Sequence, residues 1–105
     1  MLSESEIIRL EFPKAKFGIC FSINELNDVV IDNHIAFIKV SHNYPVREPC
    51  DKIFMCKNLS GESIKIRDLI NCLIENKYRH NVYEWRWLER FYVDDDGVVV
   101  PFFGS

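Results

Sequence analysis

The chain has 105 residues, of which 48% are hydrophobic and 28% are charged, and its formal net charge is −3. This length suits one hydrophobic core, so we expect residues 1–105 to form a single domain. The negative charge argues against a nucleic-acid-binding protein, and the short apolar runs argue against a membrane-spanning one, because phosphates require a basic surface and a bilayer requires about 20 apolar residues.

The first predicted elements are two short strands near the N-terminus. The apolar residues Ile8, Leu10 and Phe12 alternate with charged ones, a period of two that is typical of a half-buried strand, and Pro13 then ends the run. Residues 17–21 are rich in aromatic and β-branched side chains, which also favours a strand. The short connection predicts that the two strands pair antiparallel as a hairpin.

A capping box predicts a short helix near residues 23–28. Ser22 and Glu25 have the spacing at which a hydroxyl and a carboxylate each satisfy an unpaired backbone amide. The helix must be short, because residues 29–31 are β-branched and are followed by turn residues. Residues 35–40 then read as a strand.

The longest predicted loop covers residues 41–51. It contains Pro45 and Pro49, and each proline keeps the preceding residue out of helical conformation. Residues 52–57 return to a strand pattern, and residues 58–63, which include a glycine, predict the next turn.

The clearest pattern in the chain predicts a helix over about residues 66–78. Apolar residues recur at i, i+3, i+4, i+7, i+8 and i+12, which places them in one helical stripe. These residues are Ile66, Leu69, Ile70, Leu73, Ile74 and Tyr78. A stripe of this width normally packs against a sheet, so this helix is expected to cover one face of it.

Residues 83–93 fit a strand or a helix, and the strand is favoured because aromatic side chains suit a pleated surface. In the strand, one face would carry Tyr83, Trp85, Trp87, Phe91 and Val93, and the other would carry Glu84, Arg86 and Arg90, with Glu89 as the exception. The acidic residues 94–96 and Gly97, followed by three valines, predict a hairpin turn and a returning strand.

Together these elements predict an α+β fold. The expected architecture is an antiparallel sheet of about five to six strands, with one principal helix over about residues 66–78 packed on one face and a short helix near residues 23–28.

No catalytic residue, metal site or cofactor is predicted. The four glycines, at positions 18, 61, 97 and 104, do not fit a dinucleotide-binding or phosphate-binding loop. The three histidines lack metalloprotease spacing, and no two cysteines have the C-x-x-C spacing. The cysteines Cys20, Cys50, Cys56 and Cys72 have apolar surroundings and no export signal precedes them, which favours free buried thiols in an intracellular protein, cytoplasmic or nuclear.

The candidate binding residues are Tyr83, Trp85, Arg86, Trp87 and Arg90. Tryptophan, tyrosine and arginine are enriched where proteins bind proteins, because they bury a large area and keep a polar group. Packing of the same tryptophans in the core is the competing interpretation. Both remain open at this point.

The leading hypothesis is a small non-enzymatic module that binds a protein partner or a second copy of itself, through the C-terminal aromatic and arginine strand or the edge of its hairpin. The first alternative is a small enzyme with a polar site in loop 41–51, which contains His42, Tyr44, Arg47 and Asp51. The second is weak nucleic-acid binding through Arg79, Arg86 and Arg90. No membrane partner is expected.

Overall fold

The computed structural model describes residues 1–42, 50–76 and 87–104, with the backbone alone for residues 41, 42, 50 and 51. The helical elements are α1 (Glu4–Glu11), the 3-10 helix η1 (Glu25–Asn27) and α2 (Ile66–Glu75). The strands are β1 (Gly18–Ile19), β2 (Val29–Ile31), β3 (Ile35–His42), β4 (Cys50–Lys57), β5 (Ile64–Lys65), β6 (Trp87–Val93) and β7 (Val99–Gly104).

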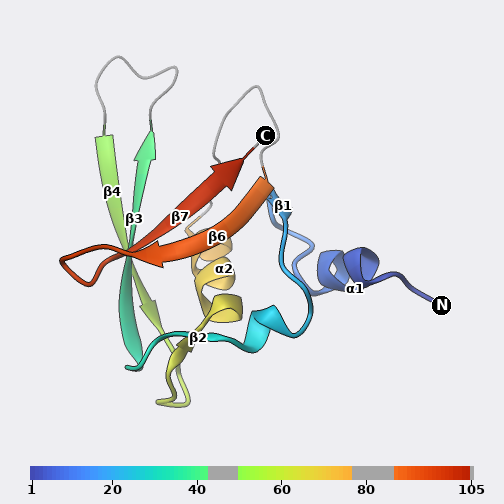
Figure 1. Cartoon of the computed structure of the whole chain (residues 1–105), viewed down its shortest axis with the longest axis horizontal. Helices are drawn as coiled ribbons and strands as arrows, with labels where there is room; N and C mark the ends of the chain where they lie inside the picture. Colours follow the sequence, from blue (N-terminus) through green and yellow to red (C-terminus); the bar gives the residue numbers. More distant parts are fainter. Residues whose placement is uncertain (43–49, 77–86, 105) are drawn as a thin grey trace.

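The main sheet has five strands in the order β1-β6-β7-β3-β4, and β2 and β5 form a separate two-stranded sheet. The sheet is mixed, because β1 pairs with β6 and β3 pairs with β7 in parallel. The expected α+β class is therefore confirmed, whereas the antiparallel expectation holds only for the β3–β4 and β6–β7 pairs and for the small sheet. The main sheet curls around α2, which lies on its inner face (Figure 1).

The N-terminal segment that was predicted as a strand is the helix α1. The Ser3 hydroxyl accepts a hydrogen bond from the backbone amide of Glu6 at 3.2 Å, so a side-chain cap starts the helix. Ile8 and Phe12 are buried, while Leu10 is 67% exposed. The prediction was wrong because positions i and i+4 share a face in a strand and in a helix alike. Only the midway residue, Leu10, distinguishes a strand from a helix, because it would be buried in the strand and is exposed in the helix.

The predicted hairpin between this segment and residues 17–21 is also wrong. β1 is a true strand, but it lies beside β6, with Gly18 opposite Trp87 and Ile19 opposite Leu88 in parallel register. The pairing is therefore made with a strand far along the chain, which local sequence patterns do not reveal.

The capping box before η1 is confirmed. The backbone amide of Ser22 donates to the Glu25 carboxylate at 2.9 Å, and the amide of Glu25 donates to the Ser22 hydroxyl at 3.1 Å. The helix is one short 3-10 turn whose Leu26 is buried in the core. β2 follows directly, as its β-branched residues favour.

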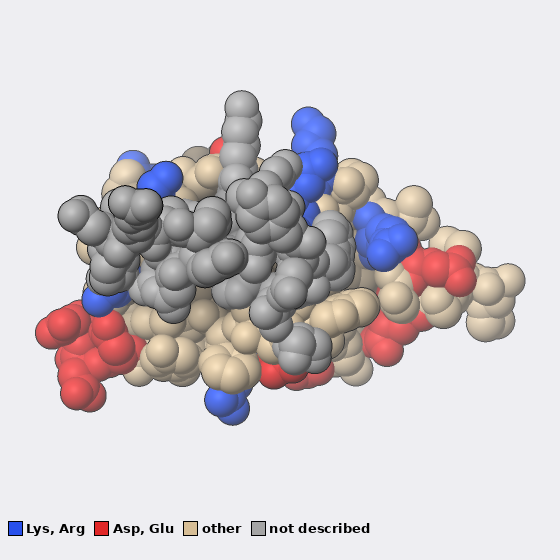
Figure 2. Space-filling view, turned by 90° about the horizontal axis from the view of Figure 1, so that it is seen from above, with Lys and Arg blue, Asp and Glu red and all other residues tan. Residues whose placement is uncertain are grey.

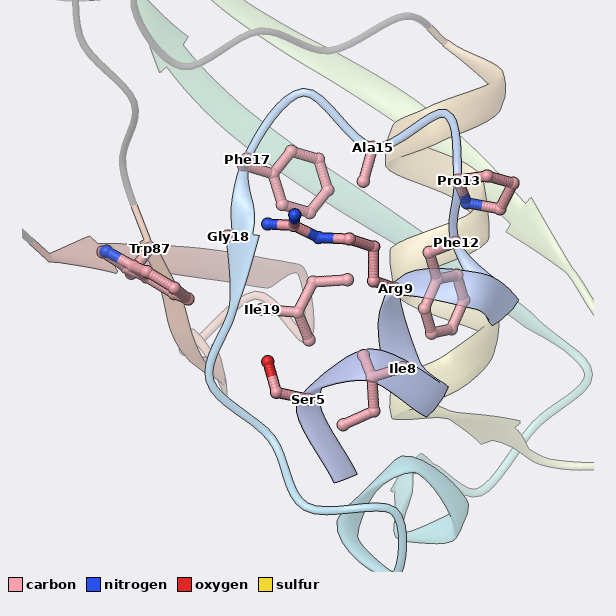
Figure 3. Close-up of a pocket in the computed structure, with 10 residues that line it drawn as sticks. All are labelled: Ser5, Ile8, Arg9, Phe12, Pro13, Ala15, Phe17, Gly18, Ile19 and Trp87. Carbon is pink, nitrogen blue, oxygen red and sulfur yellow. The ribbon is translucent and has the colours of Figure 1, made fainter. Parts of the chain in front are cut away.

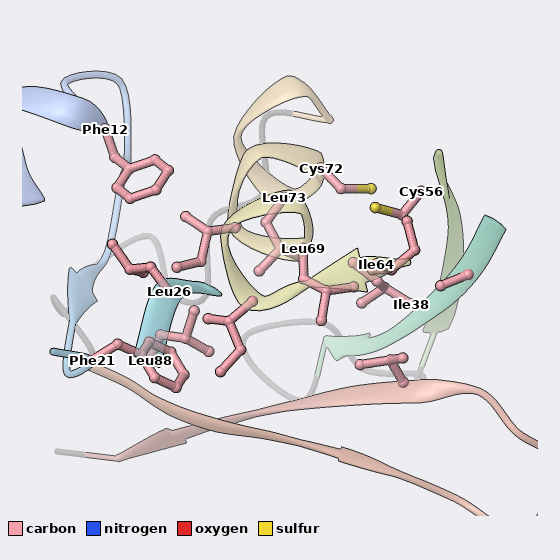
Figure 4. Packing of buried hydrophobic residues seen from close by; sticks show 14 of the residues in the cluster. Phe12, Phe21, Leu26, Ile38, Cys56, Ile64, Leu69, Cys72, Leu73 and Leu88 are labelled. Atoms are coloured by element: carbon pink, nitrogen blue, oxygen red, sulfur yellow. The ribbon is translucent and has the colours of Figure 1, made fainter. Parts of the chain in front are cut away.

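The core lies between α2 and the concave face of the main sheet (Figure 4). The α2 side chains Ile66, Leu69, Ile70 and Leu73 are buried, which confirms the predicted stripe as far as the structure describes it. The helix ends at Glu75 with Asn76 as its C-cap, so it is shorter than the predicted span to residue 78, and Tyr78 lies outside the described residues. The sheet and loops contribute the buried side chains of Phe12, Phe17, Phe21, Leu26, Ala36, Ile38, Val40, Ile64, Leu88 and Val99.

Polar contacts fix the start of α2. The Asp68 carboxylate accepts a hydrogen bond from the Lys65 backbone amide at 2.9 Å, which satisfies one of the amides that a helix start leaves unpaired. The Arg67 guanidinium binds both carboxylate oxygens of Glu11, at 2.6 and 3.2 Å. It also donates to the Asn27 side chain. Arg67 thus links α2 to α1 and to η1.

The strand predicted over residues 83–93 is confirmed for its described part, β6. Its register with β7 shifts between two pairs, Leu88 with Phe103 and Arg90 with Phe102, so Glu89 is an extra residue in a β-bulge. The predicted division of the side chains between the two faces is therefore wrong beyond this point. Trp87 lies on the same face as Arg90, and Phe91 lies on the opposite, core-facing side.

The predicted acidic hairpin turn joins β6 to β7. The Asp94 carboxylate accepts hydrogen bonds from the backbone amides of Asp96 and Val98, both at 2.9 Å. Gly97 has a φ of +79°, a backbone conformation that residues other than glycine adopt only at an energetic cost.

We expect Asp94→Ala to lower the free energy of unfolding by about 1 kcal/mol, because two backbone amides in the turn lose their acceptor. Thermal denaturation followed by circular dichroism should show a melting temperature lower by about 4–8 °C. Asp95→Ala is the matched control, since no hydrogen bond of the described residues uses the exposed Asp95 side chain. Equal melting temperatures for the two variants would contradict this role of Asp94.

Candidate interaction surface

The structure places two of the five predicted binding residues, Trp87 and Arg90, on β6. The other three, Tyr83, Trp85 and Arg86, lie outside the described residues, as does Arg79.

Both residues lie on the face of the main sheet that points away from α2, which we call the outer face. Residues paired across an antiparallel ladder point to the same side of the sheet. Leu88 and Val99 point into the core, so the register places Trp87, Arg90 and Tyr92 on the outer face. The bulge at Glu89 is what brings Trp87 and Arg90 to the same side.

The Trp87 indole is held flat against the backbone of β1. A Cβ atom built on Gly18 would lie only 2.3 Å from the Trp87 ring, so position 18 admits no side chain while the ring stays in place. Trp87 is nevertheless 42% exposed. It covers the sheet at β1 and also presents part of its ring to solvent.

Arg90 lies over the neighbouring ring of Phe102. The centre of its guanidinium is 4.5 Å from the ring centroid, a cation–π geometry, and the two residues are paired in the β6–β7 ladder. This contact presents a positive charge and an aromatic ring together on the outer face.

The same face continues across β3 and β4 as an apolar surface. Phe37 pairs with Met55, and Lys39 pairs with Ile53, so these four side chains also point outward. Ile53 is 61% exposed. The large apolar residues exposed on the outer face are Phe37, Ile53, Met55, Trp87, Tyr92 and Phe102. In the described part of the chain, no element is packed over them.

Acidic residues gather at the two ends of the long axis, as Figure 2 shows from above. One group is the turn of residues 94–96, and the other is the first turn of α1, with Glu4 and Glu6. The outer face instead carries Lys39 and Arg90 among its apolar side chains. Glu89 lies at its margin, where its carboxylate would meet a Cβ placed on Gly104.

The C-terminal hairpin lies inside the strand order of the main sheet, but, in the part of the chain that the structure describes, β1 pairs only with Trp87 and Leu88 of β6, and β3 pairs with β7 only at Val99. In the strand order, β6 has β1 and β7 as neighbours, and β7 has β6 and β3. The outermost strands are the two-residue β1 and the eight-residue β4. The outer face and the edge of the hairpin therefore both stay candidate binding surfaces.

A pocket of about 300 Å³ opens between α1 and β1, next to Trp87 (Figure 3). Apolar side chains such as Ile8, Phe12 and Phe17 form much of its wall, and the Arg9 side chain reaches into it from α1. Among the described residues, its lining includes no histidine, cysteine or carboxylate.

The two alternative functions rest mainly on residues outside the described ranges. Residues 43–49 of the proline-containing loop are not described, and His42 and Asp51 are described by their backbone alone. Within the described ranges, no three His, Cys, Asp or Glu side chains cluster as a metal ion requires. No helix in the described part of the chain is long and apolar enough to cross a membrane.

Comparison with protein-family models, with curated proteins and with solved structures finds no match for this chain. Its function is therefore argued from its own geometry.

Sequence analysis missed the part of the outer face that β3 and β4 provide. The strand predicted over residues 35–40 is apolar at nearly every position, so its sequence does not show which side chains face the core. Phe37 was assigned no role for this reason, although it is exposed beside Met55. The continuous apolar run was the available signal. A strand that is apolar on both faces needs something packed on each face, so it predicts a second packing surface.

Proposed function

We propose that this chain is a non-enzymatic interaction module that associates with a second copy of itself, and that α1 of one copy docks on the outer face of the other. The observation that carries this proposal is the coexistence of two exposed apolar surfaces on one chain. One is the outer face of the main sheet, and the other is the solvent-facing side of α1.

The outer face has the size and composition of a docking surface. Five strands spaced about 4.8 Å apart span roughly 20 Å, which is wide enough to seat a helix of about 10 Å diameter. Exposed aromatic and methionine side chains are enriched at the centres of protein interfaces. Contiguous apolar patches above a few hundred Å² are uncommon on proteins that stay monomeric.

The solvent-facing side of α1 provides a matching apolar ridge. Ile7 and Leu10 are exposed one helical turn apart, and Leu2, just before the helix, is exposed as well. Figure 1 shows α1 at one end of the molecule and β3 and β4 at the other. The ridge therefore cannot cover the outer face beside β3 and β4 of its own chain, which favours a contact between copies.

Charge supports this pairing of surfaces. The α1 residue Glu6 lies next to Leu10 on the helix surface, at a spacing of four residues. The strand register places the basic residues Lys39, Lys57 and Arg90 on the outer face. An arriving α1 would bring an acidic side chain to a basic surface, which favours the encounter. A face-to-face contact of two sheets would instead bring like charges together.

This contact joins two different surfaces, so it is heterologous, and an open assembly retains one unused α1 ridge at one end and one unused outer face at the other. The wild-type protein should then form rings or open chains whose mean mass increases with concentration. Sedimentation velocity or light scattering over a concentration series would measure this directly.

Two surface variants should be monomeric alone and should associate with each other when mixed. Leu10→Glu places a charge in the α1 ridge, and Phe37→Glu places one in the outer face; both side chains are exposed, so folding should be preserved. Each variant keeps the surface that the other lacks. We expect an equimolar mixture to contain a dimer of one copy of each, detected by light scattering coupled to size-exclusion chromatography.

Leu59→Glu is the matched control, because Leu59 is fully exposed in the turn before β5, away from both surfaces. It should associate as the wild type does. A wild-type protein that stays monomeric throughout the series would contradict self-association. Variants that are monomeric alone and also monomeric when mixed would reject docking of α1 on the sheet.

A further inference from the structure

Two cysteines face each other across the core, away from the proposed interaction surface. Cys56 lies on β4 and Cys72 lies on α2, and their sulfur atoms point toward one another (Figure 4). Both are free thiols, and their residues are only 3% and 4% exposed. Sixteen positions separate them in sequence, so the fold itself brings the sulfurs together.

The hydrogen bonds around the pair make the two thiols unequal. The hydrogen bond from Cys56 lowers the pKa of Cys72, although burial and the charge of Glu75 oppose it. The Asn76 side-chain amide also donates to the Cys72 sulfur, at 3.6 Å. The same thiol–thiol hydrogen bond raises the pKa of Cys56, and burial raises it further. The Cys56 thiol also donates to the Asp68 carbonyl oxygen at 3.5 Å and the Cys72 thiol to the Met55 carbonyl oxygen at 3.6 Å, so both are hydrogen-bonded as thiols. The lowered pKa favours Cys72 as the thiol that ionises first.

A pocket gives small molecules a route to this pair. It has a volume of about 220 Å³ and lies between α2 and the end of β4 with its following turn. Cys56 and Cys72 both contribute to its wall, together with Leu59, Asp68, Asn71 and Glu75. The thiols are thus buried from bulk solvent but border an open cavity, whereas a cysteine enclosed in the core would be inert.

We infer that Cys56 and Cys72 form a redox-active dithiol that low-molecular-weight disulfides oxidise to an intramolecular disulfide. The inference rests on the facing sulfurs and the cavity beside them, and it is independent of the proposed self-association.

The exchange proceeds in two balanced steps. The thiolate of Cys72 attacks one sulfur of the small disulfide, which breaks the S–S bond, forms a mixed disulfide and releases the first small thiol. Cys56 then loses its proton, and its sulfur attacks the Cys72 sulfur and releases the second small thiol. The protein loses two protons and two electrons, and the small disulfide gains them as two thiols.

The disulfide would connect β4 covalently to α2. It would close a loop of about 16 residues, and cross-links of this length stabilise a protein mainly by restricting its unfolded chain. We therefore expect the oxidised protein to melt several degrees above the reduced one, and a reducing agent should reverse the shift.

The test uses the full chain with Cys20→Ser and Cys50→Ser, so that Cys56 and Cys72 are its only thiols. After incubation with oxidised glutathione, intact mass spectrometry should show a mass lower by two hydrogens and no bound glutathione. Cys56→Ser in this background should retain one glutathione on Cys72, because the resolving thiol is gone. Cys72→Ser should react more slowly, because burial and the charges of Asp68 and Glu75 still raise the pKa of the remaining thiol.

If a serine variant fails to fold, the wild-type chain can be treated with oxidised glutathione in the same way and examined by peptide mapping. A peptide pair linked through Cys56 and Cys72 is the expected product. A protein that keeps both thiols, or that accumulates a mixed disulfide without closing the intramolecular bond, would overturn the inference.

Discussion

Replacing Leu73 by aspartate is expected to abolish the cooperative unfolding transition. Leu73 is completely buried on the inner face of α2, among side chains of the main sheet and of η1. Truncating such a leucine alone costs about 2–5 kcal/mol, and a buried carboxylate without a partner costs several more. A total stability of about 5–15 kcal/mol leaves little or nothing after that loss.

Circular dichroism during heating would measure this loss at a concentration where the wild type is monomeric, with Leu10→Asp as the matched control. Leu10 is also a leucine on a helix, but most of its side chain is in solvent. Its variant should keep a sharp transition near the wild-type melting temperature. A Leu73→Asp protein that melts as sharply as the control would show that the helix does not pack as described here.

Replacing Phe12 by alanine should lower the free energy of unfolding by about 3–5 kcal/mol. Phe12 follows α1 directly, and its buried ring packs in the core together with Ile8. Urea denaturation followed by fluorescence would measure the change as a lower midpoint with an unchanged slope.

Leu10→Ala decides whether this segment is a helix or a strand. In a strand, Leu10 and Phe12 would share the buried face, and truncating either would destabilise the protein strongly. In α1, Leu10 is exposed, so the same truncation should change the stability by less than about 0.5 kcal/mol. Comparable losses for Leu10→Ala and Phe12→Ala would contradict the helix.

The contrast between α2 and α1 shows which elements could be predicted from sequence. The α2 stripe includes steps of both three and four residues, and only a helix places all of them on one side. In α1, the buried pair Ile8 and Phe12 is four residues apart, which fits both periodicities. The cap formed by Ser3 and Glu6 was the signal that could have decided between them.

The candidate surface could be predicted only in part. Trp87 and Arg90 were identified by composition, and the structure places both on the outer face. Their common face could not be predicted, because it depends on one extra residue, Glu89, in the β6–β7 ladder. The contribution of β3 depends on which strands are neighbours, and the parallel pairing of β3 with β7 joins segments far apart in sequence.

The pairing of β1 with β6 has a consequence for how the chain acquires its fold during synthesis. Gly18 leaves the ribosome early, yet its partner Trp87 follows about 70 residues later, which takes roughly 3–14 seconds at about 5–20 residues per second. β1 cannot be paired in the sheet during that interval, so the sheet closes on its N-terminal side only after nearly the whole chain has been made. A nascent chain arrested before β6 should consequently be more sensitive to protease around residues 13–21 than the released protein is.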